Sequence, residues 1–279
     1  MKNRLLITAL LIIISFSVYL GWGDKGHKIV ASNAMKNLSG SMFIPKDWQK
    51  YVIDHSVDPD YRKGEDKTEA PKHFIDIDYY KEFLKGEMIQ NLDSLKKKYP
   101  DSVITKMGTL PWAVEDSYNK LIKAFKSKKK QDILLYMSDL AHYVGDSYQP
   151  QHTNLNYNGQ LTGQKGLHFR YEIDMLDSNV VEINSRFEGG KPAVVKNIKE
   201  VTFDAITRAN TYADVISTAD KIALQNNGTG KYDDTYRKLM WFRTKYMTID
   251  QLNLAGKGLA SAIYSAWVNA GKPDLRRIK

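Results

Sequence analysis

Histidine and carboxylate residues recur along this chain at a spacing that suits metal binding. The chain has only six histidines, at positions 27, 55, 73, 142, 152 and 168. His142 and Asp146 are four residues apart, and so are His168 and Glu172. Residues four apart on a helix leave the same face one turn apart, so each pair can grip one cation. Imidazole and carboxylate are the ligands that zinc accepts where thiolates are missing, and the chain has no cysteine.

A further histidine follows the first pair closely. Pro150 ends the helix that carries His142, so His152 can address a different point in space. One zinc ion needs three or four ligands, and two pairs with His152 offer donors for more than one ion. A lone histidine would be an ordinary core or surface residue, but the combined pattern makes metal binding the leading interpretation.

The elements that must position these residues are mainly helices. Apolar residues recur with a period near 3.6 over long stretches, while residues 154–166 are rich in Asn, Gly and Gln and indicate an exposed connection. No repeat or linker divides the chain. We therefore expect an all-α fold with one mainly helical domain over residues 22–279. The expected helices span residues 26–37, 84–97, 110–126, 129–147, 168–175, 194–226, 232–246 and 250–270.

Composition and the first residues narrow the class of protein. With 279 residues, 42% of them hydrophobic, the chain can bury a core, and the lack of cysteine excludes a disulfide scaffold. The net charge of +9 suggests anionic partners. Lys2 and Arg4 precede an apolar run over residues 5–20, the layout of a secretory signal peptide. We expect a signal peptide over residues 1–21, cleavage before Trp22, and a secreted or periplasmic protein.

Four blocks of the sequence together resemble the zinc-dependent single-strand nucleases, which share a superfamily with bacterial zinc-dependent phospholipase C. They are Trp22-Gly-Asp-Lys-Gly-His27, Ala70-Pro-Lys-His73-Phe-Ile-Asp76, His142-Tyr-Val-Gly-Asp146-Ser-Tyr-Gln-Pro150-Gln-His152, and His168-Phe-Arg-Tyr-Glu172.

The resemblance implies three zinc ions on a mainly α-helical fold. The first ion would be held by Asp58, His73, His142 and Asp146. The second would be held by His152, His168 and Glu172. The third would use His27, Asp146 as a bridge, and the amino group and carbonyl of Trp22, which form a chelate only after signal cleavage. A zinc-bound hydroxide at the ions sharing Asp146 would attack phosphorus, with Asp58 orienting or deprotonating it, and the products would carry 5′ phosphates.

The block around Asp58 matches the nuclease pattern imperfectly. The nucleases carry Trp-Ala-Asp-x-x-Arg, whereas this chain reads Ser56-Val-Asp58-Pro-Asp-Tyr-Arg62, with one residue more before the arginine. Asp60 is a rival for the role of Asp58, which is preferred for its spacing to His73. Arg62 is a candidate for stabilising charge in the transition state, and a solvated surface charge is the alternative. His55 is left as an ordinary surface or loop residue.

The choice of substrate stays open between two enzymes and a binding protein. Phe74 and Asp76 match nuclease residues that stack on and hydrogen-bond a base, which favours an endonuclease acting on single-stranded DNA and RNA. Glu172 and the short connection from His152 to His168 resemble phospholipase C, whose substrate would be membrane phospholipid. The third hypothesis is a non-catalytic binding protein braced by structural zinc. No obligate protein partner is indicated.

Overall fold

A computed structural model describes residues 22–278 of the chain. The expected signal peptide, residues 1–21, lies outside the described residues and stays a prediction. Every regular element among the described residues is helical. The α-helices are α1 Gly23–Leu38, α2 Lys46–His55, α3 Asp58–Arg62, α4 Leu92–Lys96, α5 Asp101–Met107, α6 Leu110–Ser127, α7 Lys130–Ser147, α8 Leu167–Phe169, α9 Leu176–Ser178, α10 Val180–Ser185, α11 Ile198–Asn210, α12 Ala213–Asn226 and α13 Asp234–Asn269.

Shorter helical turns join these helices. Five are 3₁₀ turns, and η5 is a stretch of π-helix. They are η1 Ala70–His73, η2 Ile77–Tyr79, η3 Phe83–Lys85, η4 Pro150–His152, η5 Arg170–Met175 and η6 Leu275–Arg277. The expected all-α class is therefore confirmed.

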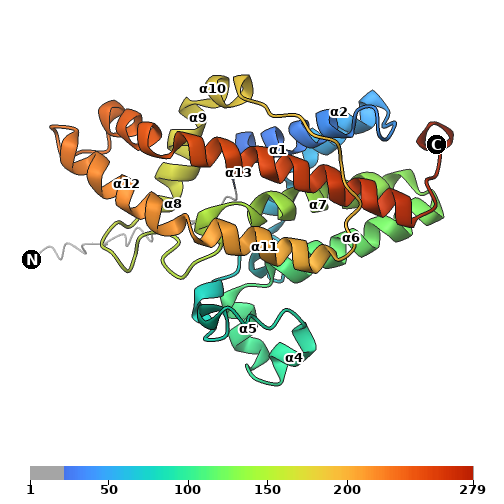
Figure 1. Cartoon of the computed structure of the whole chain (residues 1–279), viewed down its shortest axis with the longest axis horizontal. Coiled ribbons are helices and arrows are strands. Elements are labelled where there is room, and N and C mark those ends of the chain that lie inside the picture. Colours follow the sequence, from blue (N-terminus) through green and yellow to red (C-terminus); the bar gives the residue numbers. More distant parts are fainter. Residues whose placement is uncertain (1–21, 279) are drawn as a thin grey trace, which may run out of the picture.

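The long helix α13 runs through the body of the molecule, and α1, α6, α7 and α12 pack against it (Figure 1). Close packing of α1 on α13 depends on a small residue, because a Cβ at Gly256 would lie 2.6 Å from Cβ of Asn33. The helices α4 and α5 lie below this body in Figure 1. No helix of the described part combines the length and the apolar character needed to cross a bilayer.

Four of the expected helices differ from the observed ones. Residues 84–97 do not form one helix, because Gly86 adopts a left-handed conformation and the carbonyl of Gln90 accepts a hydrogen bond from the Trp112 indole. The expected helix over residues 194–226 is two helices, α11 and α12, separated at residues 211–212. Conversely, residues 232–246 and 250–270 belong to the single helix α13, which continues through buried Thr248 and Ile249.

Candidate metal centre

Five donor side chains from distant parts of the sequence meet in the interior. His27 comes from α1, Asp60 from α3, His73 from η1, and His142 and Asp146 from α7. Nε2 of His142 lies 2.8 Å from Nδ1 of His73 and 3.2 Å from Oδ2 of Asp146. Nε2 of His27 lies 3.5 Å from Oδ1 of Asp146. The arrangement therefore surrounds a common space with imidazole and carboxylate atoms.

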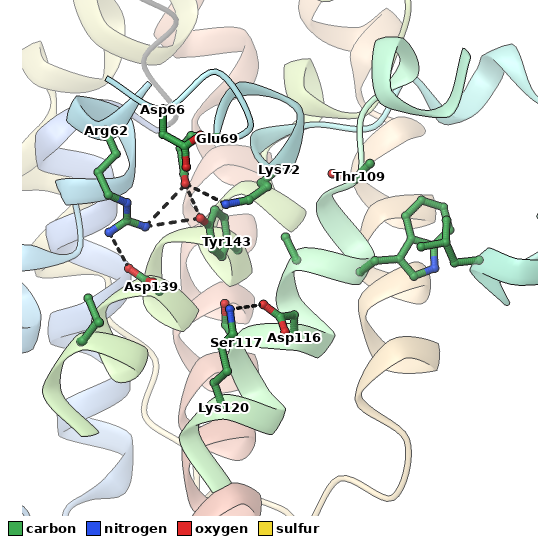
Figure 2. Close-up of a pocket in the computed structure, with 14 residues that line it drawn as sticks. Arg62, Asp66, Glu69, Lys72, Thr109, Asp116, Ser117, Lys120, Asp139 and Tyr143 are labelled. Atoms are coloured by element: carbon green, nitrogen blue, oxygen red, sulfur yellow. Dashed lines mark hydrogen bonds and ion pairs between the residues drawn. The ribbon is translucent and has the colours of Figure 1, made fainter. Parts of the chain in front are cut away.

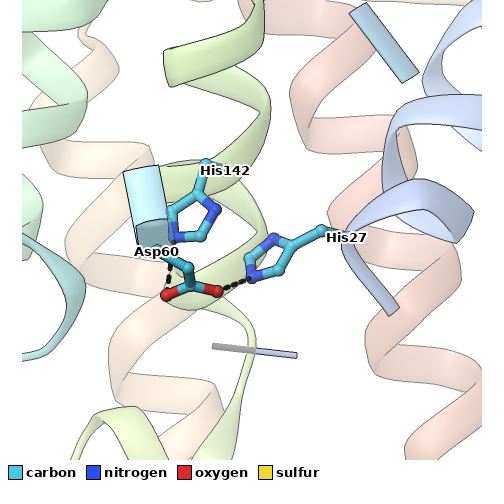
Figure 3. Close-up of side chains that lie close together, drawn as sticks. All are labelled: His27, Asp60 and His142. Atoms are coloured by element: carbon cyan, nitrogen blue, oxygen red, sulfur yellow. Dashed lines mark ion pairs between the residues drawn. The ribbon is translucent and has the colours of Figure 1, made fainter. Parts of the chain in front are cut away.

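Asp60 stands between two of these histidines (Figure 3). Its Oδ2 lies 3.9 Å from Nε2 of His27, and its Oδ1 lies 3.7 Å from Nε2 of His142. The rings of His27 and His142 stack with their centroids 3.9 Å apart. Donor atoms of His27, Asp60 and His142 are close enough together to hold one metal ion, as are those of His73, His142 and Asp146.

A third group of donors lies beside the first two. Nε2 of His168 lies 2.5 Å from Oε2 of Glu172, and Nε2 of His152 lies 3.4 Å from the same oxygen. His168 and Glu172 sit where α8 passes into the π-helical η5, so the expected second pair is brought together. Nδ1 of His152 lies 3.4 Å from Oδ1 of Asp146, which joins this group to the other donors.

The structure places Asp60, and not Asp58, among the donors. The side chain of Asp58 is 46% exposed, and its Oδ2 lies 2.7 Å from Nδ1 of His55. The side chain of Asp60 is 1% exposed. Asp58 is the first residue of α3, so its side chain turns back to α2, whereas the side chain two residues later turns inward. The preference for Asp58 over its rival is thus corrected, and His55 has a partner in Asp58.

Arg62 points away from the donors. Its Nη1 donates a hydrogen bond of 2.9 Å to Asp139, and its Nη2 lies 3.5 Å from Oε1 of Glu69 (Figure 2). Lys63 instead lines the cavity that contains His73, and its Nζ lies 2.6 Å from Oδ1 of Asp60. Because Asp60 is the donor, the residue three positions later is Lys63, so the expected role of Arg62 is corrected.

Several buried polar atoms among these residues have no hydrogen-bond partner, which indicates whether the residues could bind a metal ion. Both ring nitrogens of His27, both carboxylate oxygens of Asp146 and Oε1 of Glu172 are buried without a hydrogen-bond partner. Leaving such groups unpaired in the interior is costly, and a divalent cation would satisfy them together. The donor set of imidazoles and carboxylates is one that zinc accepts, so the residues fit the ion.

The protonation states of His27 and Asp60 also suit metal binding. Burial lowers the pKa of His27 to about 3, so its ring is neutral at ordinary pH, as a ligand must be. Burial opposes ionisation of Asp60, but neighbouring His142 and Lys63 lower its pKa to about 2. Burial raises the pKa of Glu172 to about 8, and the opposing effect of neighbouring His152 is smaller.

Trp22 holds the beginning of α1 against the donors. Its indole is fully buried, and Nε1 donates a hydrogen bond of 2.7 Å to the carbonyl of Gly145. The same glycine leaves room for the neighbouring histidine, since a Cβ there would lie 3.1 Å from Nδ1 of His27. The first described residue is thereby fixed next to Asp146.

A cavity of about 650 Å³ opens onto His73, His152 and His168. Its other lining residues combine aromatic, apolar and polar side chains. They are Lys63, Ala70, Phe74, Asp76, Tyr79, Lys106, Met107, Gln151, Leu155, Tyr157, Gln160 and Leu161. The expected substrate residues Phe74 and Asp76 thus share one cavity with the donors.

The backbone around Phe74 is held by two other segments. The amide of Asp76 donates to the carbonyl of Met107 at 2.7 Å, and the amide of Ile75 donates to the carbonyl of His152 at 2.9 Å. Gly108 has a φ of +90°, and a Cβ there would overlap the carbonyl of Phe74. A glycine is therefore required for this close approach.

Sequence reasoning missed three residues of the site. Gln149 donates to Glu172 with its side-chain amide and is completely buried. Glu69 is buried with Oε1 at 3.5 Å from Nε2 of His73, and Lys63 pairs with Asp60. The signal for Glu69 was its spacing of four from His73, the same spacing that identified the other pairs.

The sequence was compared with known proteins. Residues 22–263 match the S1/P1 nuclease family, and no match was found among curated proteins. The matched range contains every donor described above. Family members are zinc-dependent and hydrolyse phosphodiester bonds, in keeping with the histidine and carboxylate groups of the interior. The chain belongs to the S1/P1 nuclease family.

Proposed function

We propose that the protein is a secreted endonuclease that hydrolyses single-stranded DNA and RNA to products with 5′ phosphates, using three zinc ions. The observation that carries the proposal is the shared cavity, in which donors for metal lie next to aromatic side chains and Asp76. A flat base can stack on an aromatic ring, and such stacking contributes about 1–3 kcal/mol per base with little dependence on sequence.

The donors divide into three sets in this proposal. Asp60, His73, His142 and Asp146 would hold one ion. His152, His168 and Glu172 would hold a second. His27 and Asp146 would hold a third together with the amino group and carbonyl of Trp22, which requires removal of residues 1–21. When bound, zinc lowers the pKa of coordinated water and neutralises charge on a phosphodiester.

The protein's own residues supply position and charge. With a pKa of about 2, Asp60 stays ionised at neutral pH, which suits a ligand or an orienting group better than a general base. Lys63 lines the cavity, and its ammonium group beside Asp60 would favour negative charge on a phosphate bound there. Phe74, Tyr79 and Tyr157 offer rings for stacking, and the carboxyl of Asp76 can hydrogen-bond a base edge.

The excess of positive charge agrees with a polyanionic substrate. The chain carries 41 Lys and Arg against 32 Asp and Glu, and Lys106 lies in the cavity wall with Lys63. Lysines near a phosphate backbone strengthen binding and make it sensitive to salt. We therefore expect the Michaelis constant for a single-stranded oligonucleotide to rise with ionic strength.

The test uses protein that begins at Trp22, first stripped by chelator and then reloaded with zinc. Single-stranded DNA, RNA, duplex DNA and phosphatidylcholine vesicles are offered in parallel. Labelling of the products by a 5′ polynucleotide kinase, before and after phosphatase treatment, shows whether the 5′ ends carry the phosphate. We expect zinc-dependent cleavage of the single strands and 5′-phosphate ends. Release of phosphocholine without cleavage of nucleic acid would assign the site to phospholipase C chemistry. Zinc binding with no turnover on any substrate would make the protein a zinc-stabilised binding protein.

A further inference from the structure

The two ring nitrogens of His73 face different surroundings. Nδ1 lies 2.8 Å from Nε2 of His142 and 3.4 Å from both Oδ1 of Asp60 and Oδ2 of Asp146. Nε2 points the other way, is buried, and has no hydrogen-bond partner. A neutral imidazole that binds metal through Nδ1 carries its proton on Nε2. That proton needs an acceptor on the far side of the ring.

The carboxylate of Glu69 is the acceptor that the fold provides. Its Oε1 lies 3.5 Å from Nε2 of His73. The corresponding nitrogens of two other histidines face neutral carbonyls instead. Nδ1 of His142 lies 2.8 Å from the carbonyl oxygen of Ser56, and Nδ1 of His152 lies 2.6 Å from that of His73. Nδ1 of His152 also lies 3.4 Å from Oδ1 of Asp146, which is itself one of the donors. Among these three rings, only His73 is backed by a carboxylate that is not one of the donors.

Three further side chains hold Glu69 in place. The hydroxyl of Tyr143 donates a hydrogen bond to Oε1, and Nζ of Lys72 donates to Oε2 at 2.9 Å (Figure 2). Nη2 of Arg62 lies 3.5 Å from Oε1. Arg62 is itself anchored by a hydrogen bond of 2.9 Å to Asp139. With three donors around it, the carboxylate can stay ionised although it is almost completely buried.

Glu69 and the side chains around it line a cavity separate from the one that contains Phe74 and Asp76. A cavity of about 560 Å³ is lined by Arg62, Glu69, Lys72, Asp139 and Tyr143 among others, and it lies behind His73 as seen from the donors. Arg62, Lys72 and Tyr143 converge on Glu69 (Figure 2). Asp116 and Lys120 line the same cavity and pair with each other. The network therefore supports the back of the metal centre.

We infer that Glu69 is a positioning residue of the metal centre, which fixes the Nε2-protonated tautomer of His73 and increases the basicity of its Nδ1 toward zinc. The inference rests on the zinc centre of the proposed function. A carboxylate behind a histidine ligand orients the ring and strengthens metal binding, and loss of such a partner weakens the affinity about 10–100-fold.

The experiment compares Glu69→Gln with Glu82→Gln. Glu82 is a matched control because it also accepts a hydrogen bond from a tyrosine, at 2.7 Å from Tyr99, and pairs with a lysine, Lys98. Zinc affinity is measured by competition with a chromogenic chelator, and the fold by circular dichroism. We expect the affinity of Glu69→Gln to fall about 10–100-fold and that of Glu82→Gln to be unchanged. Equal affinities of Glu69→Gln and the unmodified protein would overturn the inference.

A second measurement reads the tautomer directly. In the zinc-loaded protein, long-range nitrogen–proton NMR spectra should show His73 protonated on Nε2, with the proton resonance displaced in Tyr143→Phe, which removes one hydrogen bond to Glu69. A proton on Nδ1 of His73 would overturn the inference even if Glu69→Gln fails to fold. Both readouts are independent of nuclease activity. If the protein binds zinc as expected but cleaves no nucleic acid, the proposed function is wrong, whereas the inferred role of Glu69 is unaffected.

Discussion

Nζ of Lys63 lies 2.6 Å from Oδ1 of Asp60, so a lysine and a carboxylate of the candidate metal centre, one helical turn apart, form an ion pair inside the protein. Both side chains are nearly withdrawn from solvent. Lys63 also lines the cavity that contains Phe74 and Asp76, whereas Arg62 faces Asp139 and Glu69. Of these two neighbouring basic residues, Lys63 is therefore the one that lines the cavity.

Replacing Lys63 by methionine should remove this charge at nearly constant volume. We expect kcat/KM for single-stranded DNA to fall about 10²–10³-fold, the usual effect of deleting one preorganised donor at a developing negative charge. Lys63→Arg should retain most of the activity. Lys120→Met serves as the control, because Lys120 pairs with Asp116 outside the catalytic cavity. An unchanged kcat/KM in Lys63→Met would remove the lysine from the mechanism.

Asparagine substitutions should separate the two candidate aspartates. Asp60→Asn deprives the centre of a buried carboxylate between His27 and His142, so we expect bound zinc to be lost and activity to drop more than about 10³-fold. Asp58→Asn only breaks a half-exposed pair with His55 and should stay within about twofold of the original rate. Metal content by mass spectrometry and initial rates test both. The reverse ranking would restore Asp58.

The raised pKa of Asp76 should make the stability of the protein depend on pH. Burial, with a smaller contribution from the charge of Asp78, raises its pKa to about 8. The folded protein then binds a proton that the unfolded chain has lost above the usual aspartate pKa of about 3.9. As pH rises between those two pKa values, the contribution of Asp76 to the free energy of unfolding therefore falls by at most about 1.4 kcal/mol per pH unit.

Asp76→Asn removes that titration. We expect the variant to gain stability over the unmodified protein as pH rises from about 5 to about 8, by about 1–4 kcal/mol across the interval. Urea unfolding of both proteins at each pH measures the difference, in which effects of pH on zinc binding cancel because the ligands are the same. A difference independent of pH would mean that Asp76 is already ionised at about pH 5.

Gly108→Ala should damage both stability and activity. The substitution forces a Cβ onto a residue with a φ of +90° and into the carbonyl of Phe74, so we expect a loss of at least about 2 kcal/mol and a displaced cavity wall. Gly86→Ala is the control, since its φ is +77° but nothing lies within 4 Å of the added Cβ. If the two variants lose the same stability, the close approach at Phe74 contributes nothing.

An extra residue before Trp22 should empty one ion site. Such an extension converts the terminal amine into an amide, which can no longer serve as the proposed nitrogen ligand. We expect the zinc content to fall from three ions to two, while the buried indole and its bond to Gly145 persist. Elemental analysis of the extended and processed proteins measures this. Three ions in both would exclude the amine as a ligand.

The part of the site carried by one helix was the most predictable. His142 and Asp146 lie four apart on α7 and come within 3.2 Å, as helical geometry requires. The choice between Asp58 and Asp60 was less predictable. It depends on where the five-residue helix α3 begins and on which of its side chains face the interior. No periodic pattern in so short a segment fixes that register, and the error at Arg62 followed from it.

The predicted helix boundaries were wrong where tertiary packing outweighs the local conformational preference of the residues. The expected interruption at residues 247–249 is absent. Thr248 is buried, and its hydroxyl bonds to the Thr244 carbonyl and to Tyr171, so α13 continues. Glu69 was overlooked for a similar reason. Its neighbours Arg62 and Tyr143 come from other elements, and their convergence is a property of the tertiary structure.

The donors stretch from His27 in the first helix to Glu172 beyond the middle of the chain, and two of their three groups combine residues from distant segments. In a zinc finger the ion can organise a small unfolded peptide, but here the apolar core must bring distant segments together before those two groups can hold an ion. Metallation is then a late event in the life of the molecule. The metal supply of the compartment where folding finishes decides which ion the enzyme acquires.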